Sequence, residues 1–468
     1  MASPSVSKSA QIHSRIGHPV VDCDGHWVEY GPVFLDYAKQ VIGGNAPELY
    51  RRLLPTLAGP SRLPFEERRA QRVPQSGWWI MPSRNTVDRA TAMAPRLMHE
   101  RLPEMGIDVA VLYPTVIGTL LPFVRDDEIR RGGARAFNMF AADLFGPYSD
   151  RLLPVAGIPM HTPQEAIEEL EFVSRLGYKA VMLGALIGRP STGRHSWRDT
   201  LGLDSAHNYD PVWAKCLELG FAPTFHNQSQ GFGFRTAVSN WVYNHIGHFA
   251  VAGEAICKSL FLGGVTRRFP RLKFSFLEGG GAWACNLYSD LIRHWKTRNV
   301  EALEHVNPAN LDRKALTELL RRYGDQRMKD TLERGEVEDP QMTMPPDIDE
   351  FAACEIKQAE DIRDLFVPNF YFGCEAEDSL NAWAFNKRIN PFGSRLNVVL
   401  GSDIGHFDVT DMSQILEEAY ELVEHGLITE EDLKDLTFAN PVRFFGGVNP
   451  NFFKGTAVEK QAAELLAQ

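Results

Sequence analysis

The stretch PVVDCDGH, residues 19–26, decides the fold that we expect for this chain. Its first half is a short apolar run, and its second half is a set of polar and turn-forming residues. An apolar run that ends in this way is typical of a buried strand. The pattern returns at residues 108–113, which end at Pro114 and Thr115. Repetition of the unit along the chain predicts a parallel sheet whose strands end close to one another.

Amphipathic helical patterns separate the apolar runs. Residues 163–176 carry apolar side chains at helical spacing and follow a candidate N-cap, Thr162. Residues 412–424 show the same spacing, and Thr429 starts a capping pattern. Strands that alternate with helices eight times predict an α/β fold, the (β/α)8 or TIM barrel. The eight expected strands are 19–23, 108–113, 152–158, 179–183, 221–225, 272–277, 370–372 and 396–400.

The pattern divides the chain into an N-terminal arm at 1–18, a single metal-dependent barrel at 19–450 and a C-terminal tail at 451–468. Two stretches are longer than ordinary connections: about 30–105 after the first strand, and about 286–368 between strands six and seven. We expect helical insertions there. Long insertions in a barrel usually shape a binding site or a subunit contact.

Composition and charge exclude several functional classes. The chain has 44% hydrophobic and 23% charged residues, which are ordinary values for a soluble globular protein. Its net charge is −11 and it has no long Lys or Arg run, so nucleic acid is not an expected partner. Residues 1–17 contain no apolar segment, and Glu254 and Lys258 interrupt the most apolar long stretch, so neither secretion nor a membrane span is expected. Six cysteines without a C-x-x-C pair fit reduced thiols in the cytoplasm.

Side chains able to bind metal follow three of the expected strands. Asp24 and His26 follow strand one, His226 follows strand five and Asp403 follows strand eight. The active sites of (β/α)8 barrels lie where the strands end, because the βα loops meet there. Imidazole nitrogen and carboxylate oxygen from separate strands therefore predict a divalent-metal site at the mouth of the barrel.

Four segments resemble the amidohydrolase-related family of metal-dependent barrel enzymes, which contains aminocarboxymuconate semialdehyde and resorcylate-type decarboxylases. The resemblance spans nearly the whole chain. It implies that strand one supplies an acid and a histidine, strand five a histidine and strand eight an aspartate, which correspond here to the four residues named above. The segments are VDCDGH at 21–26, GGVTRRFPRL at 263–272, FLEGGGAW at 276–283 and GSD at 401–403.

The sequence departs from the decarboxylating members at one position. Those members have His-Gly-Gly-Gly after strand six, whereas Glu278 stands here in place of their acid/base histidine. A carboxylate there could bridge two metal ions or orient a ligand histidine. His245 and His248, three residues apart, lie on one face of a helix that leads toward strand six, and one of them could reach a metal. His406, three residues after Asp403, is a further candidate ligand.

The number of candidate ligands favours two metal ions. A single zinc-type ion needs three or four protein ligands and an open position, whereas this mouth offers up to seven donors. Carboxylates and imidazoles without thiolate suit iron and manganese, and zinc is also compatible. We expect Glu278, Asp403 and His248 to act in catalysis. The candidate metal ligands are Asp24, His26, His226, Glu278, Asp403, His245 and His406.

Three segments are similar to a branch of the family that contains dinuclear iron or manganese/iron hydroxylases, including an isobutyrate-hydroxylating oxygenase component: the Asp-x-His start, Asn-His-x-x-His and Glu-Gly-Gly-Gly-x-Trp. The resemblance implies an O2-activating monooxygenase that hydroxylates a small organic acid or similar substrate, with a reductase or ferredoxin that delivers electrons. The alternative is a redox-neutral decarboxylase or hydrolase in which Asp403 or Glu278 is the general base. A second alternative is a non-catalytic subunit, because a paralogous barrel can keep the fold and lose a metal. A homo- or hetero-oligomer with a paralogous subunit is therefore expected.

We expect the two long insertions to shape the substrate pocket. Trp241 and Trp283 are candidates for an apolar pocket wall. Arg235 is a candidate clamp for a substrate carboxylate.

Overall fold

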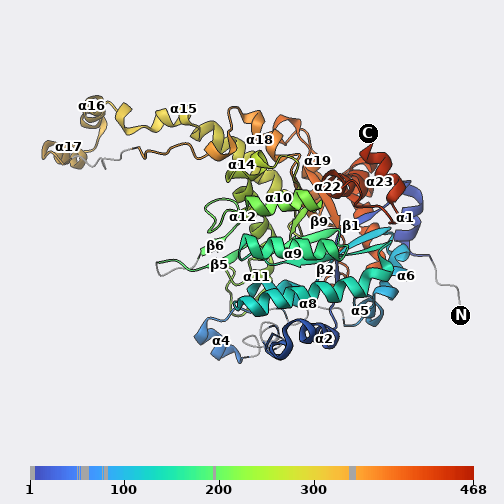
Figure 1. Cartoon of the computed structure of the whole chain (residues 1–468). Coiled ribbons are helices and arrows are strands. Elements are labelled where there is room, and N and C mark those ends of the chain that lie inside the picture. The colour runs from blue at the N-terminus through green and yellow to red at the C-terminus, as the bar shows by residue number, and fades with distance from the viewer. Residues whose placement is uncertain are drawn as a thin grey trace.

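Eight parallel strands form a barrel at the centre of the molecule (Figure 1). Neighbours in the sheet follow the order β1-β2-β3-β4-β7-β8-β9-β10, so each strand pairs with the next barrel strand along the chain. All eight strands lie where the sequence predicts them, and the predicted TIM barrel is confirmed. They are β1 (Val21–Trp27), β2 (Val109–Pro114), β3 (Leu152–Ile158), β4 (Ala180–Leu183), β7 (Pro223–Phe225), β8 (Phe274–Phe276), β9 (Phe370–Glu375) and β10 (Asn397–Gly401).

Contacts between the ends of β1 and β10 close the barrel. The backbone amide of Asp403 donates to the carbonyl of Asp24 at 2.9 Å, and the amide of His26 donates to the carbonyl of Ile404 at 2.8 Å. The buried carboxylate of Asp22 accepts from the hydroxyl of Ser402 at 2.6 Å and from its amide at 2.9 Å. These bonds fix the position of Asp403 relative to β1 without any contribution from the Asp403 side chain.

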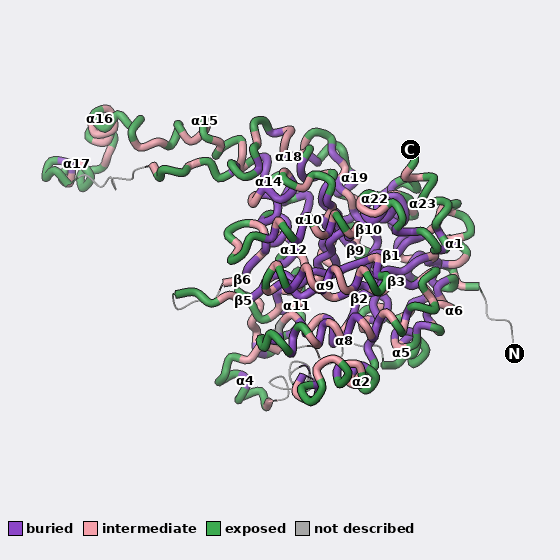
Figure 2. Tube along the Cα trace, viewed as in Figure 1, coloured by how far each residue is buried: buried purple, intermediate pink, exposed green. Residues whose placement is uncertain are grey.

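The outer helices pack their apolar faces on the barrel, as the buried parts of the tube in Figure 2 show. The helix predicted at 163–176 is α9 (Pro163–Arg175), and the hydroxyl of Thr162 accepts from the amide of Glu165. The capping box at Thr429 starts α21 (Glu430–Lys434). The other helices of the barrel layer are α7 (Ile117–Leu120), α8 (Asp127–Phe145), α10 (Asp210–Leu219), α11 (Trp241–His245), α12 (His248–Leu262), α13 (Val265–Arg268), α14 (Ala282–Arg298), α18 (Ala359–Phe366), α19 (Ala382–Phe385), α20 (Ile415–Glu424) and α22 (Asn440–Val448).

Both ends of the chain pack on the barrel layer. In the N-terminal arm, α1 (Lys8–Ile16) lies against α20, where the amide of Glu417 donates to the hydroxyl of Ser9. Beyond residue 450, Phe452 and Phe453 are buried in one cluster with interior residues of the barrel strands, and α23 (Glu459–Leu466) follows. Burial of each large apolar side chain contributes roughly 2–3 kcal/mol, so the segment expected to be a tail covers part of the core.

Both insertions are helical, and they differ in how they pack. The first contains α2 (Gly31–Ile42), α4 (Phe65–Gln71), α5 (Thr86–Met93) and α6 (Pro95–Met105). The second contains residues 300–336, here called the helical extension, which project from the barrel in Figure 1. The extension consists mainly of α15 (Val300–Leu303), α16 (Arg313–Tyr323) and α17 (Gln326–Glu333). A hairpin of β5 (Ile187–Arg189) and β6 (Trp197–Asp199) was not predicted.

The computed structural model describes residues 6–49, 51, 53, 63–75, 77, 83–192, 197–336 and 344–468. All six cysteines lie in these ranges and are buried, as expected of inert thiols. Among the helices in the same ranges, none is both long enough and apolar enough to span a bilayer.

Candidate metal centre

Donor atoms from β1, β7 and β10 meet at the carboxyl ends of the strands. Asp24 and His26 belong to β1 itself, His226 directly follows β7, and Asp403 lies two residues beyond β10. His26 Nε2 lies 3.5 Å from Asp24 Oδ1 and 3.2 Å from Asp403 Oδ1. His226 Nε2 lies 3.7 Å from Asp24 Oδ1. These separations are those of atoms that share one ion, because metal–ligand bonds of about 2 Å leave neighbouring ligands about 3 Å apart.

Two more predicted residues extend this cluster. Glu278 Oε2 lies 3.0 Å from His226 Nε2, on the side of β8. His406 Nδ1 lies 2.7 Å from Asp403 Oδ1, and its ring stacks on that of His26 with 3.8 Å between centroids. Two groups of mutually close donors result, and His26 belongs to both: Asp24 with His26 and His226, and His26 with Asp403 and His406.

The electrostatics of the cluster are those of a buried cation site. Burial raises the pKa of Asp24 and of Asp403 well above the usual value, and it lowers the pKa of His26 well below. In the described part of the chain, Asp24 Oδ1, His226 Nε2 and Glu278 Oε2 are buried without a hydrogen-bond partner. Buried polar atoms are nearly always paired in native proteins. Converging nitrogen and oxygen atoms that make no hydrogen bond therefore fit a divalent cation, and this donor set without sulfur suits manganese, iron or zinc.

Strained backbone directs two of the carboxylates into the site. Glu278 has φ 57° and Asp403 has φ 51°, both in the left-handed region. That conformation is unfavourable for residues other than glycine by about 1–2 kcal/mol. Such strain is typical of functional sites, where the surrounding contacts hold the residue in place. Here each turn brings a carboxylate next to a histidine of the neighbouring strand, Glu278 to His226 and Asp403 to His26.

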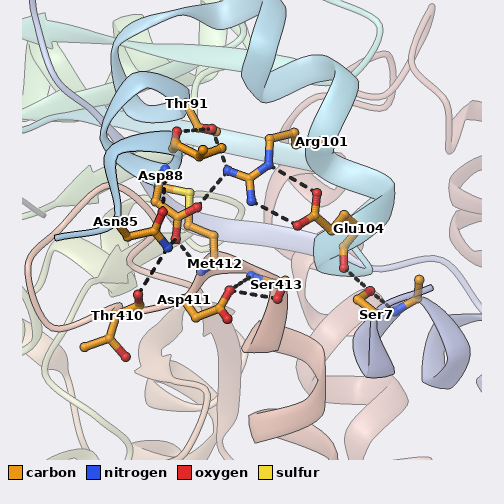
Figure 3. A network of polar contacts seen from close by, with 12 residues as sticks. Ser7, Asn85, Asp88, Thr91, Arg101, Glu104, Thr410, Asp411, Met412 and Ser413 are labelled. Carbon is orange, nitrogen blue, oxygen red and sulfur yellow. Dashed lines mark hydrogen bonds and ion pairs between the residues drawn. The ribbon is translucent and has the colours of Figure 1, made fainter. Parts of the chain in front are cut away.

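The loop after Asp403 is anchored at its far end by a buried network (Figure 3). Asp88 of α5 is fully buried and accepts from the amide of Met412 at 2.9 Å. Arg101 of α6 pairs with Asp88 at 2.7 Å, and Asn85 donates both to Asp88 and to the carbonyl of Thr410. The first insertion thus holds the loop that carries His406.

The cluster borders a cavity of ≈ 300 Å³. His26, His226, Glu278 and His406 lie in its wall. Its wall combines apolar side chains with side-chain amides and hydroxyls, which is the usual make-up of a site for a small organic ligand. No Lys or Arg of the described ranges lines the cavity. The remaining wall consists of Gly77, Pro114, Thr115, Thr119, Leu120, Pro122, Met182, Leu183, Gly184, Asn227, Gln228, Gln230, Trp241, His245, His248, Phe249, Phe407 and Asp408.

The other predicted site residues lie at different distances from the cluster. His245 and His248 both line the cavity, but neither belongs to the two tight donor groups. The ring of His245 stacks on that of Trp241 with 4.1 Å between centroids. His248 Nε2 lies 3.2 Å from the side-chain nitrogen Nε2 of Gln230. Trp241 therefore lies in the cavity wall, the position expected of a residue that contacts the substrate.

Arg235 and Trp283 are not among the residues that line the cavity. Arg235 donates to the carbonyls of Ile246 and Gly247 at 3.3 and 3.2 Å, so it supports the turn after α11. Trp283 packs edge-on against Phe372 with 5.2 Å between ring centroids, in the layer between the barrel and α14. Neither position can be read from local sequence, because both depend on how α11 and α14 pack.

Three further acidic residues follow expected strands; Glu375 and Glu29 could be expected near the mouth from those positions, whereas sequence reasoning missed Asp408. Asp408 lines the cavity, and its charge, after burial and Glu278, raises the pKa of Asp403. Glu375 lies with Glu278 in the wall of a second, adjoining cavity of ≈ 180 Å³. Glu29 is not at the metal cluster; its buried carboxylate accepts the amides of residues 116–118 at the start of α7. The sequence signal that could have identified Asp408 is its position five residues after Asp403, in the same loop.

The barrel and its donor cluster define a metal-dependent (β/α)8-barrel enzyme. Residues 21–328 match the amidohydrolase family, and the chain belongs to it.

The similar proteins described here share little sequence identity with this chain. A 2-amino-3-carboxymuconate-6-semialdehyde decarboxylase from Dictyostelium discoideum is 26% identical over 178 residues, which is 38% of this chain and 45% of that protein. The matched part thus spans less than half of the relative. An amidohydrolase from Mycobacterium avium subsp. paratuberculosis K-10 superposes with TM-score 0.54 at 17% identity, over 92% of this chain and 98% of that one. The 5-carboxyvanillate decarboxylase of Sphingomonas paucimobilis superposes with TM-score 0.50 at 14% identity, over 91% and 98%. At these identities the structures share the fold.

Proposed function

We propose that this protein is a redox-neutral, metal-dependent decarboxylase of a small organic acid. The observation that carries the proposal is the position of Asp24, His26, His226 and Asp403 beside a cavity of ≈ 300 Å³. The described wall of that cavity contains no Lys or Arg, so among the described residues the metal site is what offers positive charge to a substrate carboxylate. The decarboxylase from Dictyostelium discoideum supports this reaction class.

A divalent ion held by these residues would bind oxygen atoms of the substrate and, as a Lewis acid, stabilise the negative charge that the carbon skeleton takes up as the carbon–carbon bond breaks. The chain's own residues orient the rest of the substrate. Leu120, Met182 and Phe249 give the cavity an apolar wall that excludes water from the reacting atoms. The amides of Asn227 and Gln228 lie in the same wall and can bind polar substituents of the substrate.

Glu278 is the residue that we propose for proton transfer. Its carboxyl group lines the cavity beside His226, just beyond the end of β8. A carboxylic acid in this position can deliver a proton to the carbon that loses CO2, and the same group can then recover a proton from water. Asp403 is the second candidate for this step.

A second candidate function is oxygen-dependent hydroxylation of a small organic acid at a pair of iron ions or a manganese/iron pair. The surplus of donors favours it: Glu278 and His406 add to a set that already has four ligands, and His26 belongs to both donor groups. Electrons would then have to come from a reductase or ferredoxin. A partner subunit that has lost catalysis is a third candidate.

Metal analysis combined with an anaerobic assay separates these functions. Purified protein is loaded with Mn2+, Zn2+ or Fe2+ and incubated with aromatic and unsaturated carboxylic acids, with and without O2. The proposed function predicts CO2 release without O2 and at least one tightly bound ion. If the protein instead binds two ions and takes up O2 only when a reductant is present, the hydroxylase replaces the decarboxylase as the proposed function. Failure to bind any metal stoichiometrically would point to the non-catalytic subunit and refute both enzymes.

A further inference from the structure

The helical extension carries an apolar stripe that is partly or largely exposed in the described part of the chain. Leu316, Leu319, Leu320 and Tyr323 lie on one face of α16, and no residue of this helix is buried. Leu319 is 53% exposed and Tyr323 is 70% exposed. A helix of this length gains little stability on its own in water and usually requires packing of its apolar face. The stripe is therefore a candidate contact surface.

The extension as a whole carries seven Lys or Arg and eight Asp or Glu, but the part that contains α16 and α17 is basic. Residues 313–334 contain seven Lys or Arg and four Asp or Glu, in a protein of net charge −11. Arg321 and Arg322, which are adjacent and exposed, lie beside Tyr323 at the end of the stripe. A surface that combines these two properties fits a partner surface that is apolar and acidic.

Such a surface lies between α12 and α14 on the same molecule. A groove of ≈ 490 Å³ there is lined by the leucines Leu203, Leu262, Leu287 and Leu291 and by Phe351. The carboxylates in its wall are Asp204, Glu254, Asp290 and Glu350, and the cations are Lys258 and Arg298.

The groove and the extension are joined at Arg298. This residue lines the groove and ends α14, and the extension begins two residues later and leads away from the barrel (Figure 1). No residue of the extension lines the groove of its own chain. In a second copy related by a two-fold axis, each extension would run back toward the start of the other, so both grooves could be filled at once.

We propose that the helical extension of one copy binds the α12–α14 groove of a second copy, reciprocally, to form a homodimer. The apolar stripe of α16 covers the leucine floor of the groove. Arg321 and Arg322 face its carboxylates. This contact is independent of the reaction at the metal centre, because no residue of the extension or of the groove lines the cavity beside the metal cluster.

Chemical cross-linking of a mixture of 14N- and 15N-labelled protein tests which surfaces meet. We expect cross-links between Lys314 or Lys329 of one isotope and Lys258 of the other, and a dimer mass by light scattering at micromolar concentration. A monomer at tens of micromolar, or cross-links of these pairs only within one isotope, would overturn the proposal.

Charge reversal tests the same contact without relying on cross-linker geometry. We expect R321E/R322E and E254K/E350K each to raise the dimer Kd about tenfold or more, and the four changes combined in one chain to restore it. K387E/R388E, at an adjacent exposed basic pair outside both surfaces, is the matched control and should leave the Kd unchanged. A combined variant as weak as either pair alone, or a dimer insensitive to R321E/R322E, would refute the groove as the binding partner.

Discussion

Glu278 Oε2 lies 3.0 Å from His226 Nε2, because the two residues follow neighbouring strands of the barrel. The register pairs Phe225 of β7 with Phe276 of β8, and the amide of Leu277 donates to the carbonyl of Phe225. The left-handed turn at Glu278 then directs its carboxylate back across β7. The carboxylate therefore reaches the donor cluster without belonging to β1 or β10.

Substitution of Glu278 by glutamine tests its part in proton transfer. Glu278→Gln keeps the size and polarity of the side chain but removes its acid–base function, so we expect turnover to fall about 100-fold or more. The ion held by Asp24, His26 and His226 should remain, as measured by elemental analysis. Glu377→Gln, an exposed residue two positions beyond Glu375, is the control and should retain activity. Unchanged turnover in Glu278→Gln would remove this residue from the mechanism.

Gly405 should tolerate no side chain. It has φ 100°, and a Cβ atom there would lie 2.7 Å from the backbone carbonyl oxygen of His26. We expect Gly405→Ala to lower the free energy of unfolding by about 2–4 kcal/mol and to weaken metal binding, because the chain must shift at His26 or His406. Gly426 also has a positive φ, 67°, but a Cβ atom added there meets nothing within 4 Å. We therefore expect Gly426→Ala to lower the free energy of unfolding by only about 1 kcal/mol. Urea unfolding compares the two; equal losses would contradict the steric argument.

Loss of Arg101 should destabilise the loop that carries His406. The pair between Arg101 and the buried Asp88 is 2.7 Å long, and its removal leaves a carboxylate buried without its cation. We expect Arg101→Met to reduce stability by about 3–5 kcal/mol. Arg96→Met on the same helix breaks an exposed pair with Glu100 and should change stability by less than about 1 kcal/mol. The prediction fails if the two variants have the same midpoint in thermal unfolding.

The ion pair between His13 and Asp108, far from the metal site in the fold, should make the free energy of unfolding depend on pH. His13 Nε2 lies 2.7 Å from Asp108 Oδ2, and this hydrogen bond raises the pKa of His13 above 6.5. A histidine whose pKa is raised by folding stabilises the folded state below its unfolded pKa, and the stabilisation is lost as the pH rises through the folded pKa.

The difference in free energy of unfolding between wild type and His13→Gln should therefore be about 1 kcal/mol at pH 6 and less than half of that at pH 9. His305→Gln, at an exposed histidine of the helical extension, is the control. A difference that grows toward pH 9 would have the wrong sign and would contradict the assignment.

Much of the fold and four metal-site candidates could be predicted from local patterns. Each strand of the barrel is a short apolar run that ends in polar residues, so its position is encoded within a few neighbouring residues. Asp24, His26, His226 and Asp403 could be found because they stand at those ends, where a closed barrel brings loops together. The hairpin of β5 and β6 was missed, since its three-residue strands are too short to show a period.

The tertiary structure alone decided which polar residues meet. Arg235 and Trp283 have the side chains expected of substrate contacts, yet helix packing places one on backbone carbonyls and the other in the interlayer core. Asp22 looked like an ordinary strand residue, but barrel closure pairs it with Ser402 from the opposite end of the chain. The sequence by itself determined where strands begin and end, because that depends on neighbours along the chain. Which donors share a site depends on register, turn strain and closure, which exist only once the barrel has formed.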